Sequence, residues 1–254
     1  MSSASSPRLR PQIQLRNMPE PLHPLALNAE QRARTHMIAS LLLDYPDAAF
    51  HERMPRLAAS LRQADDGAPD PLPGPIEAAF TTFMEAADAA GPERLAQQYV
   101  VTFDLKRKSC LYLSYYAAGD TRKRGTALVT FLDAYRAAGW EFDADELPDF
   151  LPAVLEFSAV SESPVAEQLL AAHRDGIEVL RAALLSQQSP WASIVEAVCL
   201  SLPEIDEAAR ERMLALVNEG PPTETVGLSF GAPTFLGNLE PFAPGGAGNK
   251  EVRV

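Results

Sequence analysis

Apolar side chains recur at intervals of three and four residues through most of the chain, which is the spacing of one face of an α-helix. The first such stretch, 37–42, follows Asn28 and Gln31, whose spacing matches a helix capping box. A second stretch begins at Pro75, a residue type favoured in the first turn of a helix. These patterns predict two long helices, one starting after Asn28 and one starting at Pro75.

Proline, glycine and small polar residues mark the ends of the other predicted helices. We expect further helices to begin at Pro92, Thr121, Pro148 to Pro152, Ser163-Pro164, Ser189-Pro190 and Pro203, with glycine ends at Gly119 and Gly139. No stretch of alternating apolar and polar residues bounded by turns predicts a strand. The sequence therefore predicts an all-α fold, a single globular helical domain of about nine or ten helices.

Helix-breaking residues concentrate at the two ends of the chain. Five of the 22 prolines fall within 1–27, and five prolines with half of the 14 glycines fall within 219–254. Neither end shows helical periodicity. We therefore expect a flexible N-terminal extension at 1–27, an all-helical domain at 28–218 and a flexible tail at 219–254, with an exposed loop at 65–75 inside the domain.

The charge balance argues against a nucleic-acid-binding protein. Asp and Glu number 34 against 22 Lys and Arg, a formal net charge of -12, whereas a phosphate backbone requires a basic face. The chain also lacks a signal-peptide pattern and the run of roughly 20 apolar residues that a bilayer-spanning helix needs. We expect a cytoplasmic protein that does not insert into membranes.

The usual sequence marks of catalytic and metal-binding sites are missing. None of the four histidines has another histidine three or four residues away, and the two cysteines stand far apart, so no metal site is predicted. The chain contains no phosphate-binding loop, dinucleotide-binding glycine motif, nucleophile elbow or HExxH motif. We therefore expect no enzymatic activity. The alternative is an all-helical metal-dependent hydrolase whose site assembles from dispersed Asp, Glu and His.

One segment, 104–124, combines positive charge with tyrosines. It holds six cations and two acids, so its net charge of +4 leaves -16 for the rest of the chain. A predicted helix ending at Gly119 contains Tyr112, Tyr115 and Tyr116, which share one helical face at i, i+3 and i+4. Tyrosine and arginine are enriched among the residues that dominate protein interfaces. The tyrosine face is therefore either part of the core or the wall of a groove that binds a partner.

A second segment, 146–157, places carboxylates beside a predicted helix start. Asp149 lies just before Leu151-Pro152, and Glu156 lies inside the predicted helix. The Asp149 carboxylate either caps this helix or faces a groove and accepts a hydrogen bond from a partner peptide.

The blocks 99–128 and 131–159, together with LLLDYPD at 41–47, closely resemble the NarJ family. This family belongs to the redox-enzyme maturation chaperones, which also include the TorD-like and DmsD-like proteins. The resemblance covers roughly residues 30–220. In the loop before a helix, the wider group carries an acidic-proline-Asp-His pattern. Glu146, Pro148 and Asp149 match this pattern, but Phe150 stands where the group has His, so the role of that His is not carried over to this chain, whereas Asp149 remains a candidate.

The resemblance implies an all-helical cytoplasmic chaperone without a stably bound cofactor. It would bind the N-terminal segment of the apo catalytic (alpha) subunit of respiratory nitrate reductase and assist molybdenum cofactor insertion and complex assembly before membrane attachment. The molybdenum cofactor would be handled only as cargo of the client, and molybdenum cofactor biosynthesis proteins would be further partners. The residues expected to bind the partner peptide are Tyr112, Tyr115, Tyr116, Asp120, Arg122, Glu146, Asp149 and Glu156.

Overall fold

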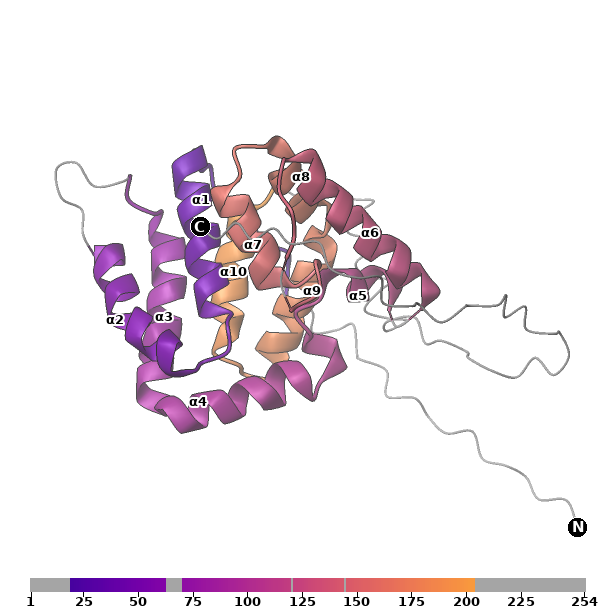
Figure 1. Ribbon diagram of the computed structural model, residues 1–254. Helices are drawn as coiled ribbons and strands as arrows, with labels where there is room; N and C mark the ends of the chain where they lie inside the picture. Colours follow the sequence, from indigo (N-terminus) through magenta and orange to yellow (C-terminus); the bar gives the residue numbers. More distant parts are fainter. Residues whose placement is uncertain (1–18, 63–69, 120, 144, 204–254) are drawn as a thin grey trace, which may run out of the picture. The chain divides into compact units, whose positions relative to one another are not determined.

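The computed structural model describes residues 19–62, 70–119, 121–143 and 145–203, all of which belong to one compact unit (Figure 1). Within these residues the chain forms ten α-helices and no strand, apart from one isolated antiparallel bridge between Tyr112 and Phe150. The expected all-α fold of about ten helices is therefore confirmed. None of the described helices is both long enough and apolar enough to cross a membrane.

The helices follow one another with short connections. In chain order they are α1 (Ala29–Leu42), α2 (Ala48–Arg62), α3 (Gly74–Ala90), α4 (Pro92–Tyr99), α5 (Leu113–Ala118), α6 (Arg122–Ala137), α7 (Leu151–Val160), α8 (Pro164–Ala172), α9 (Arg174–Ser186) and α10 (Trp191–Ser201). Between α4 and α5 lie a π-helical turn, η2 (Val100–Asp104), and a 3-10 turn, η3 (Arg107–Ser109). The helix expected after Pro203 and the tail at 219–254 lie outside the described residues.

Several helix ends form as the local sequence predicts. Asn28 and Gln31 make the expected reciprocal capping box at the start of α1. The Ser163 hydroxyl accepts a hydrogen bond from the backbone N–H of Val165 at the start of α8. Thr121 occupies the N-cap position of α6, but its hydroxyl donates to a carbonyl of the preceding turn instead of capping the helix.

The core is built around α10, which contacts α1, α3 and α9, while α1 packs along α7 (Figure 1). Trp191, at the start of α10, is fully buried. Its ring lies 5.4 to 5.7 Å from those of Phe83, Tyr99 and Phe103, which come from α3, α4 and η2. Aromatic pairs at this spacing stabilise a core beyond the apolar area that they bury.

A buried histidine links three helices of this core. The two ring nitrogens of His36 on α1 lie 2.9 Å from the hydroxyls of Ser158 on α7 and Ser201 on α10. Burial, reinforced by the positive charge of Arg32, lowers the pKa of His36 to about 3. His36 is therefore neutral and structural at physiological pH.

Residues 19–27, expected to belong to a flexible extension, pack against the helical unit. Leu22, Leu25 and Leu27 contact the hydrophobic core. The backbone N–H of Leu25 donates to the carbonyl of Leu200 at 2.8 Å. The packed part of the chain therefore begins upstream of residue 28, the expected domain boundary.

This packing has a physical cause in the buried charges of α9. Arg174, Glu178 and Arg181 are all at least 96% buried, and Glu178 bridges the two arginines at 3.5 and 2.7 Å. Buried guanidinium groups need further hydrogen-bond acceptors. The carbonyls of Leu22 and Glu20 supply them, at 2.8 Å from Arg174 and 2.7 Å from Arg181.

Candidate functional site

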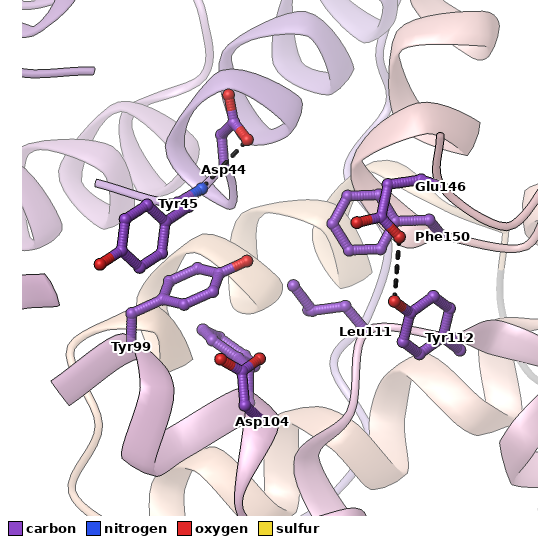
Figure 2. Close-up of a pocket in the computed structure, with 9 residues that line it drawn as sticks. Asp44, Tyr45, Tyr99, Asp104, Leu111, Tyr112, Glu146 and Phe150 are labelled. Atoms are coloured by element: carbon purple, nitrogen blue, oxygen red, sulfur yellow. Dashed lines mark hydrogen bonds between the residues drawn. The ribbon is translucent and has the colours of Figure 1, made fainter. Parts of the chain in front are cut away.

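A cleft of about 280 Å³ opens beside the C-terminal end of α1. Figure 2 shows Tyr45 and Tyr99 on one side of it and Tyr112, Glu146 and Phe150 on the other, with Leu111 between them. Its lining combines aromatic and apolar side chains with three carboxylates. The nine lining residues are Asp44, Tyr45, Tyr99, Phe103, Asp104, Leu111, Tyr112, Glu146 and Phe150.

The first side of the cleft is an aromatic cluster fixed by its neighbours. The Tyr99 hydroxyl donates to the carbonyl of Leu43 at 3.1 Å, which ties α4 to the end of α1. The Tyr99 ring lies 5.4 Å from Tyr45 and 4.7 Å from Phe103. Tyr45 is 46% exposed, so this side presents an aromatic surface to solvent.

The π-helical turn η2 shapes the floor of the cleft. Its defining hydrogen bond runs from the N–H of Leu105 to the carbonyl of Val100 at 3.0 Å, five residues back. The wider turn allows Phe103 to enter the core while the next residue, Asp104, stays exposed at the cleft. Such π-turns often occur at functional sites.

The second side depends on the bridge between Tyr112 and Phe150. The N–H of Leu113 donates to the carbonyl of Asp149 at 3.0 Å, and the N–H of Leu151 donates to that of Leu111 at 2.7 Å. These two bonds join the segment before α5 to the segment before α7. They hold the Tyr112 and Phe150 rings 5.6 Å apart at the edge of the cleft.

Two contacts hold the Tyr112 side chain, one at its hydroxyl and one at the face of its ring. Its hydroxyl donates to Glu146 Oε2 at 2.9 Å, and the Arg124 guanidinium lies 5.4 Å from the ring centre. Partial burial and the adjacent Glu146 carboxylate raise the pKa of Tyr112 to about 12. The phenol is therefore a neutral hydrogen-bond donor throughout the physiological range.

The rim of the cleft is acidic. Asp44, Asp104 and Glu146 are all exposed. Arg53 neutralises Asp44 at 3.1 Å, whereas neither Asp104 nor Glu146 forms an ion pair with another described residue. An aromatic lining beneath carboxylates that lack a described ion-pair partner suits a ligand that is both cationic and apolar. Among the described residues, no group of three or more His, Cys, Asp or Glu could hold a metal ion.

Of the residues expected to bind the partner, Tyr112 and Glu146 line this cleft. Tyr115 and Tyr116 lie in the core, each 6% exposed, and the Tyr116 hydroxyl donates to the carbonyl of Cys110 at 2.8 Å. The helix starts at Leu113, so Tyr112 precedes it in extended conformation and does not share a helical face with the other two tyrosines.

Asp149 is fully buried and does not line the cleft. Its Oδ2 accepts hydrogen bonds from the backbone N–H of Ser114 at 3.1 Å and from the Ser114 hydroxyl at 2.5 Å. The expected alternative, a cap on the following helix, is wrong: Phe150 occupies the N-cap position of α7 without a side-chain hydrogen bond. The bridge brings Asp149 to the first turn of α5 instead, where it supports the backbone that positions Tyr112.

The other expected residues lie elsewhere. Arg122 and Glu156 are exposed on α6 and α7 and do not line the cleft. Asp120 lies outside the described residues.

Several lining residues were not singled out from the sequence. Asp44 and Tyr45 lie in the LLLDYPD segment, and Tyr99 and Asp104 lie in the block that starts at residue 99, both of which carried the family resemblance. The signal was therefore present in the resemblance. It was absent from local periodicity, because the lining comes from three segments distant in sequence, 44–45, 99–112 and 146–150.

Comparison with known proteins places the chain in a family. A family model described as nitrate reductase delta subunit matches residues 69–196, about half of the chain. The probable nitrate reductase molybdenum cofactor assembly chaperone NarJ of Bacillus subtilis is 28% identical over 179 residues, which are 70% of this chain and 94% of that protein.

Two further relatives are matched over smaller shares of their length. The nitrate reductase molybdenum cofactor assembly chaperone NarJ of Escherichia coli K12 is 29% identical over 63% of this chain and 66% of its own. The nitrate reductase-like protein NarX of Mycobacterium tuberculosis is 37% identical over 63% of this chain. The matched region covers only 23% of the length of NarX. The resemblance found in the sequence is thus confirmed, and the chain belongs to the nitrate reductase delta subunit family.

Proposed function

We propose that this protein is an assembly chaperone for a respiratory nitrate reductase. It binds the N-terminal segment of the apo catalytic subunit in the cleft of Figure 2 and assists molybdenum cofactor insertion before the enzyme attaches to the membrane. The family membership supports the chaperone class, since the Bacillus subtilis and Escherichia coli relatives are named as molybdenum cofactor assembly chaperones.

The observation that supports the binding site is the acidic rim beside the aromatic side chains that line the cleft. Tyr45 and Phe150 offer apolar ring surface, while Asp104 and Glu146 offer negative charge without a described cationic partner. A peptide segment with arginine or lysine beside apolar residues buries its apolar side chains on the rings and directs its charges to the rim. This division gives affinity through the rings and selectivity through the carboxylates.

The proposed role needs no chemistry from this chain. The molybdenum cofactor is cargo that is delivered to the client, so the chaperone has to hold the client segment and release it. Molybdenum cofactor biosynthesis proteins would act as further partners. Tyr112 fits a binding role through its ring, because the phenol stays neutral and its hydrogen bond to Glu146 fixes the ring at the edge of the cleft.

The alternative of a metal-dependent hydrolase finds no support among the described residues. His36 is engaged by two serines, and His173 Nδ1 lies 2.8 Å from the carbonyl of Leu169 within its own helix connection. Burial lowers the pKa of both histidines. Neither belongs to a cluster of metal-ligating side chains.

Calorimetric titration of the full chain with a synthetic client N-terminal peptide, in the presence of a chelator, tests the proposal. We expect binding at micromolar peptide, because the lining requires no metal. The double variant Asp104→Asn/Glu146→Gln should bind about five- to tenfold more weakly, since each exposed ion pair contributes at most about 1 kcal/mol. Its affinity should also depend less on salt.

A matched control removes the same two charges elsewhere. Glu85→Gln/Asp88→Asn changes two exposed carboxylates on α3, outside the cleft, and should leave the affinity as in the unaltered protein. Absence of binding heat at tens of micromolar peptide would reject the chaperone assignment. Equal weakening in both double variants would reject the cleft as the binding site.

A further inference from the structure

A second hollow, of about 360 Å³, adjoins the π-helical turn η2 and shares no lining residue with the cleft. Thr102 of η2 lines this hollow, whereas the next residue, Phe103, lines the cleft. The volume lies within the range of about 300–1,000 Å³ that is usual for small-molecule sites. We call it the basic hollow, and its polar residues that matter below are Arg94, Gln98, Lys106, Gln187, Gln188 and Ser189.

The lining of the basic hollow differs in charge from the rest of the protein. Its described residues include two cations and four glutamines but no Asp or Glu, although acidic residues outnumber basic ones by 34 to 22 in the whole chain. Neither Arg94 nor Lys106 forms an ion pair with another described residue. Two positive charges therefore face this hollow without a described counter-charge.

The Ser189 hydroxyl is the observation that points to a ligand. Ser189 lines the basic hollow but is only 8% exposed, and its Oγ is buried without a hydrogen-bond partner in the described part of the chain. A buried hydroxyl of this kind destabilises the fold, because it has lost its hydrogen bond to water and gained none in return. A ligand that accepts the hydroxyl proton would supply the missing partner.

Hydrogen bonds fix the position of Lys106 at the basic hollow. Its Nζ donates to Oε1 of Gln187 at 2.9 Å, and Nε2 of Gln187 donates to the Ser109 hydroxyl at 3.2 Å. That hydroxyl in turn donates to the carbonyl of Thr102 at 2.6 Å. An ammonium has three donors, so Lys106 keeps two for a ligand. Because the side chain is already ordered, a ligand loses less affinity to its immobilisation.

Gln188 adds a second sign that the lining is used. Its φ of 52° is the only positive φ of a non-glycine residue in the described ranges. The turn that it forms joins α9 to α10, with the N–H of Ser189 donating to the carbonyl of Leu184 at 3.0 Å. Glycine adopts this backbone conformation at lower cost than any other residue. The backbone thus gives no reason for glutamine here, whereas the side chain lines the basic hollow.

The start of α10 contributes further positive potential. Ser189 and Pro190 line the basic hollow and directly precede Trp191, the first residue of this helix, whose first turn contains no acidic residue. The first backbone N–H groups of a helix carry a partial positive charge and favour anions. Helix and cations therefore act in the same direction.

We propose that the basic hollow is a second ligand site, which binds the phosphate group of a small molecule. A phosphate monoester carries about −1.5 to −2 charges at neutral pH and three acceptor oxygens. This matches two cations and donors from three segments: Arg94 on α4, Lys106 after η2, and Ser189 before α10. A carboxylate offers a single charge and two oxygens, so it uses this lining less fully.

Calorimetric titration of the full chain with inorganic pyrophosphate tests the proposal. We expect saturable binding with a dissociation constant below about 1 mM. Arg94→Gln/Lys106→Gln should weaken this binding at least about tenfold, since two charge-assisted contacts are lost. Ser189→Ala should weaken it by a factor of about five to ten, while its urea unfolding midpoint stays the same or rises because the unpartnered hydroxyl is gone.

Two further variants serve as controls. Arg56→Gln/Lys123→Gln removes two exposed cations outside the basic hollow and changes the net charge equally, so pyrophosphate affinity should stay as in the unaltered chain. Gln188→Gly removes a lining side chain at a position that suits glycine. We expect weaker binding in this variant without a lower unfolding midpoint, which separates the loss of the site from a loss of the fold.

Three results would overturn the inference: no saturable binding at millimolar pyrophosphate, equal weakening in the two double variants, or unchanged affinity in Ser189→Ala. Citrate, which presents its negative charge on carboxylates, tests the ligand class. Equal affinity for citrate would overturn the assignment to phosphate, and weaker binding of citrate supports it. The client peptide takes no part in these measurements, so their failure leaves the proposed function standing.

Discussion

Glu178 offers the sharpest test of how this fold holds its N-terminal segment. Its carboxylate lies between Arg174 and Arg181 and accepts a further hydrogen bond from the backbone N–H of Leu22 at 3.3 Å. The change Glu178→Gln keeps the shape and one acceptor oxygen but removes the only negative charge between two buried arginines among the described residues.

The magnitude follows from burial. The three side chains are 2 to 4% exposed, so water does not screen the two guanidinium charges when the carboxylate is neutralised. Removal of one member of a buried ion pair typically costs about 3–5 kcal/mol, because an uncompensated charge stays buried. That is a large part of the about 5–15 kcal/mol of stability usual for a folded domain.

Urea unfolding at neutral pH measures the loss. With an m-value of about 2–3 kcal/mol per molar, the midpoint should fall by about 1–2 M in the Glu178→Gln protein. The matched control is Glu167→Gln, which breaks the Arg32–Glu167 pair of 2.8 Å on a surface where the side chains are 27% and 38% exposed. Exposed pairs contribute about 0–1 kcal/mol, so this midpoint should hardly move.

Similar losses in the two variants would refute the reasoning, because burial would then not be what makes the Glu178 pair strong. A further readout is hydrogen exchange at Leu22 and Leu25. Faster exchange there in the Glu178→Gln protein is expected if the α9 charges anchor this segment through its backbone.

Three further changes probe the core and the support of the cleft. Asp149→Asn weakens the hydrogen bonds from Ser114, so urea unfolding should show the free energy of unfolding reduced by about 1–2 kcal/mol. The affinity for the client peptide should be retained. Lost affinity in a stable protein would place Asp149 in the binding site. Because His36 is neutral when folded and titrates with its ordinary pKa near 6.5 when unfolded, acid favours unfolding. The stability advantage of the unaltered protein over His36→Gln should therefore shrink by about 2 kcal/mol from pH 7 to pH 5, and a constant advantage would contradict this. Gly176→Ala should destabilise by about 1–2 kcal/mol, since its Cβ would lie 2.9 Å from Tyr116 Cβ; a gain in the unfolding midpoint would show that α9 adjusts without strain.

The helical architecture was predictable because its determinants are local. The capping box at Asn28 and Gln31, and the first-turn prolines at Pro75 and Pro92, act within one turn of the helices that they start. Such signals are complete in a short window of sequence, so the predicted starts of α1, α3 and α4 agree with the structure.

The cleft was not predictable in the same way, because a long-range bridge builds it. Tyr112 and Phe150 lie 38 residues apart, and their pairing keeps Tyr112 extended, so that α5 begins only at Leu113 and Tyr112 does not share a helical face with Tyr115 and Tyr116. The tyrosine spacing alone fitted either core or groove. Tertiary contacts decide between these two, since they bury Tyr115 and Tyr116 and leave Tyr112 partly accessible.

The N-terminal segment illustrates the same limit. Residues 19–27 carry no helical period, so nothing in their own sequence fixes a structure. Their acceptor carbonyls become necessary only because Arg174 and Arg181, about 150 residues later, are buried beside them.

The aromatic packing around Trp191 connects the lining of the cleft to the hydrophobic core. Tyr99 and Phe103 both line the cleft, and their rings lie 5.6 and 5.4 Å from the fully buried Trp191 ring. This part of the lining is therefore continuous with the core, and we expect it to keep its geometry when a peptide binds. A ligand that settles on such a preorganised surface has to order its own chain but not that of the receptor, which favours rapid exchange of one segment for another without refolding of the cleft.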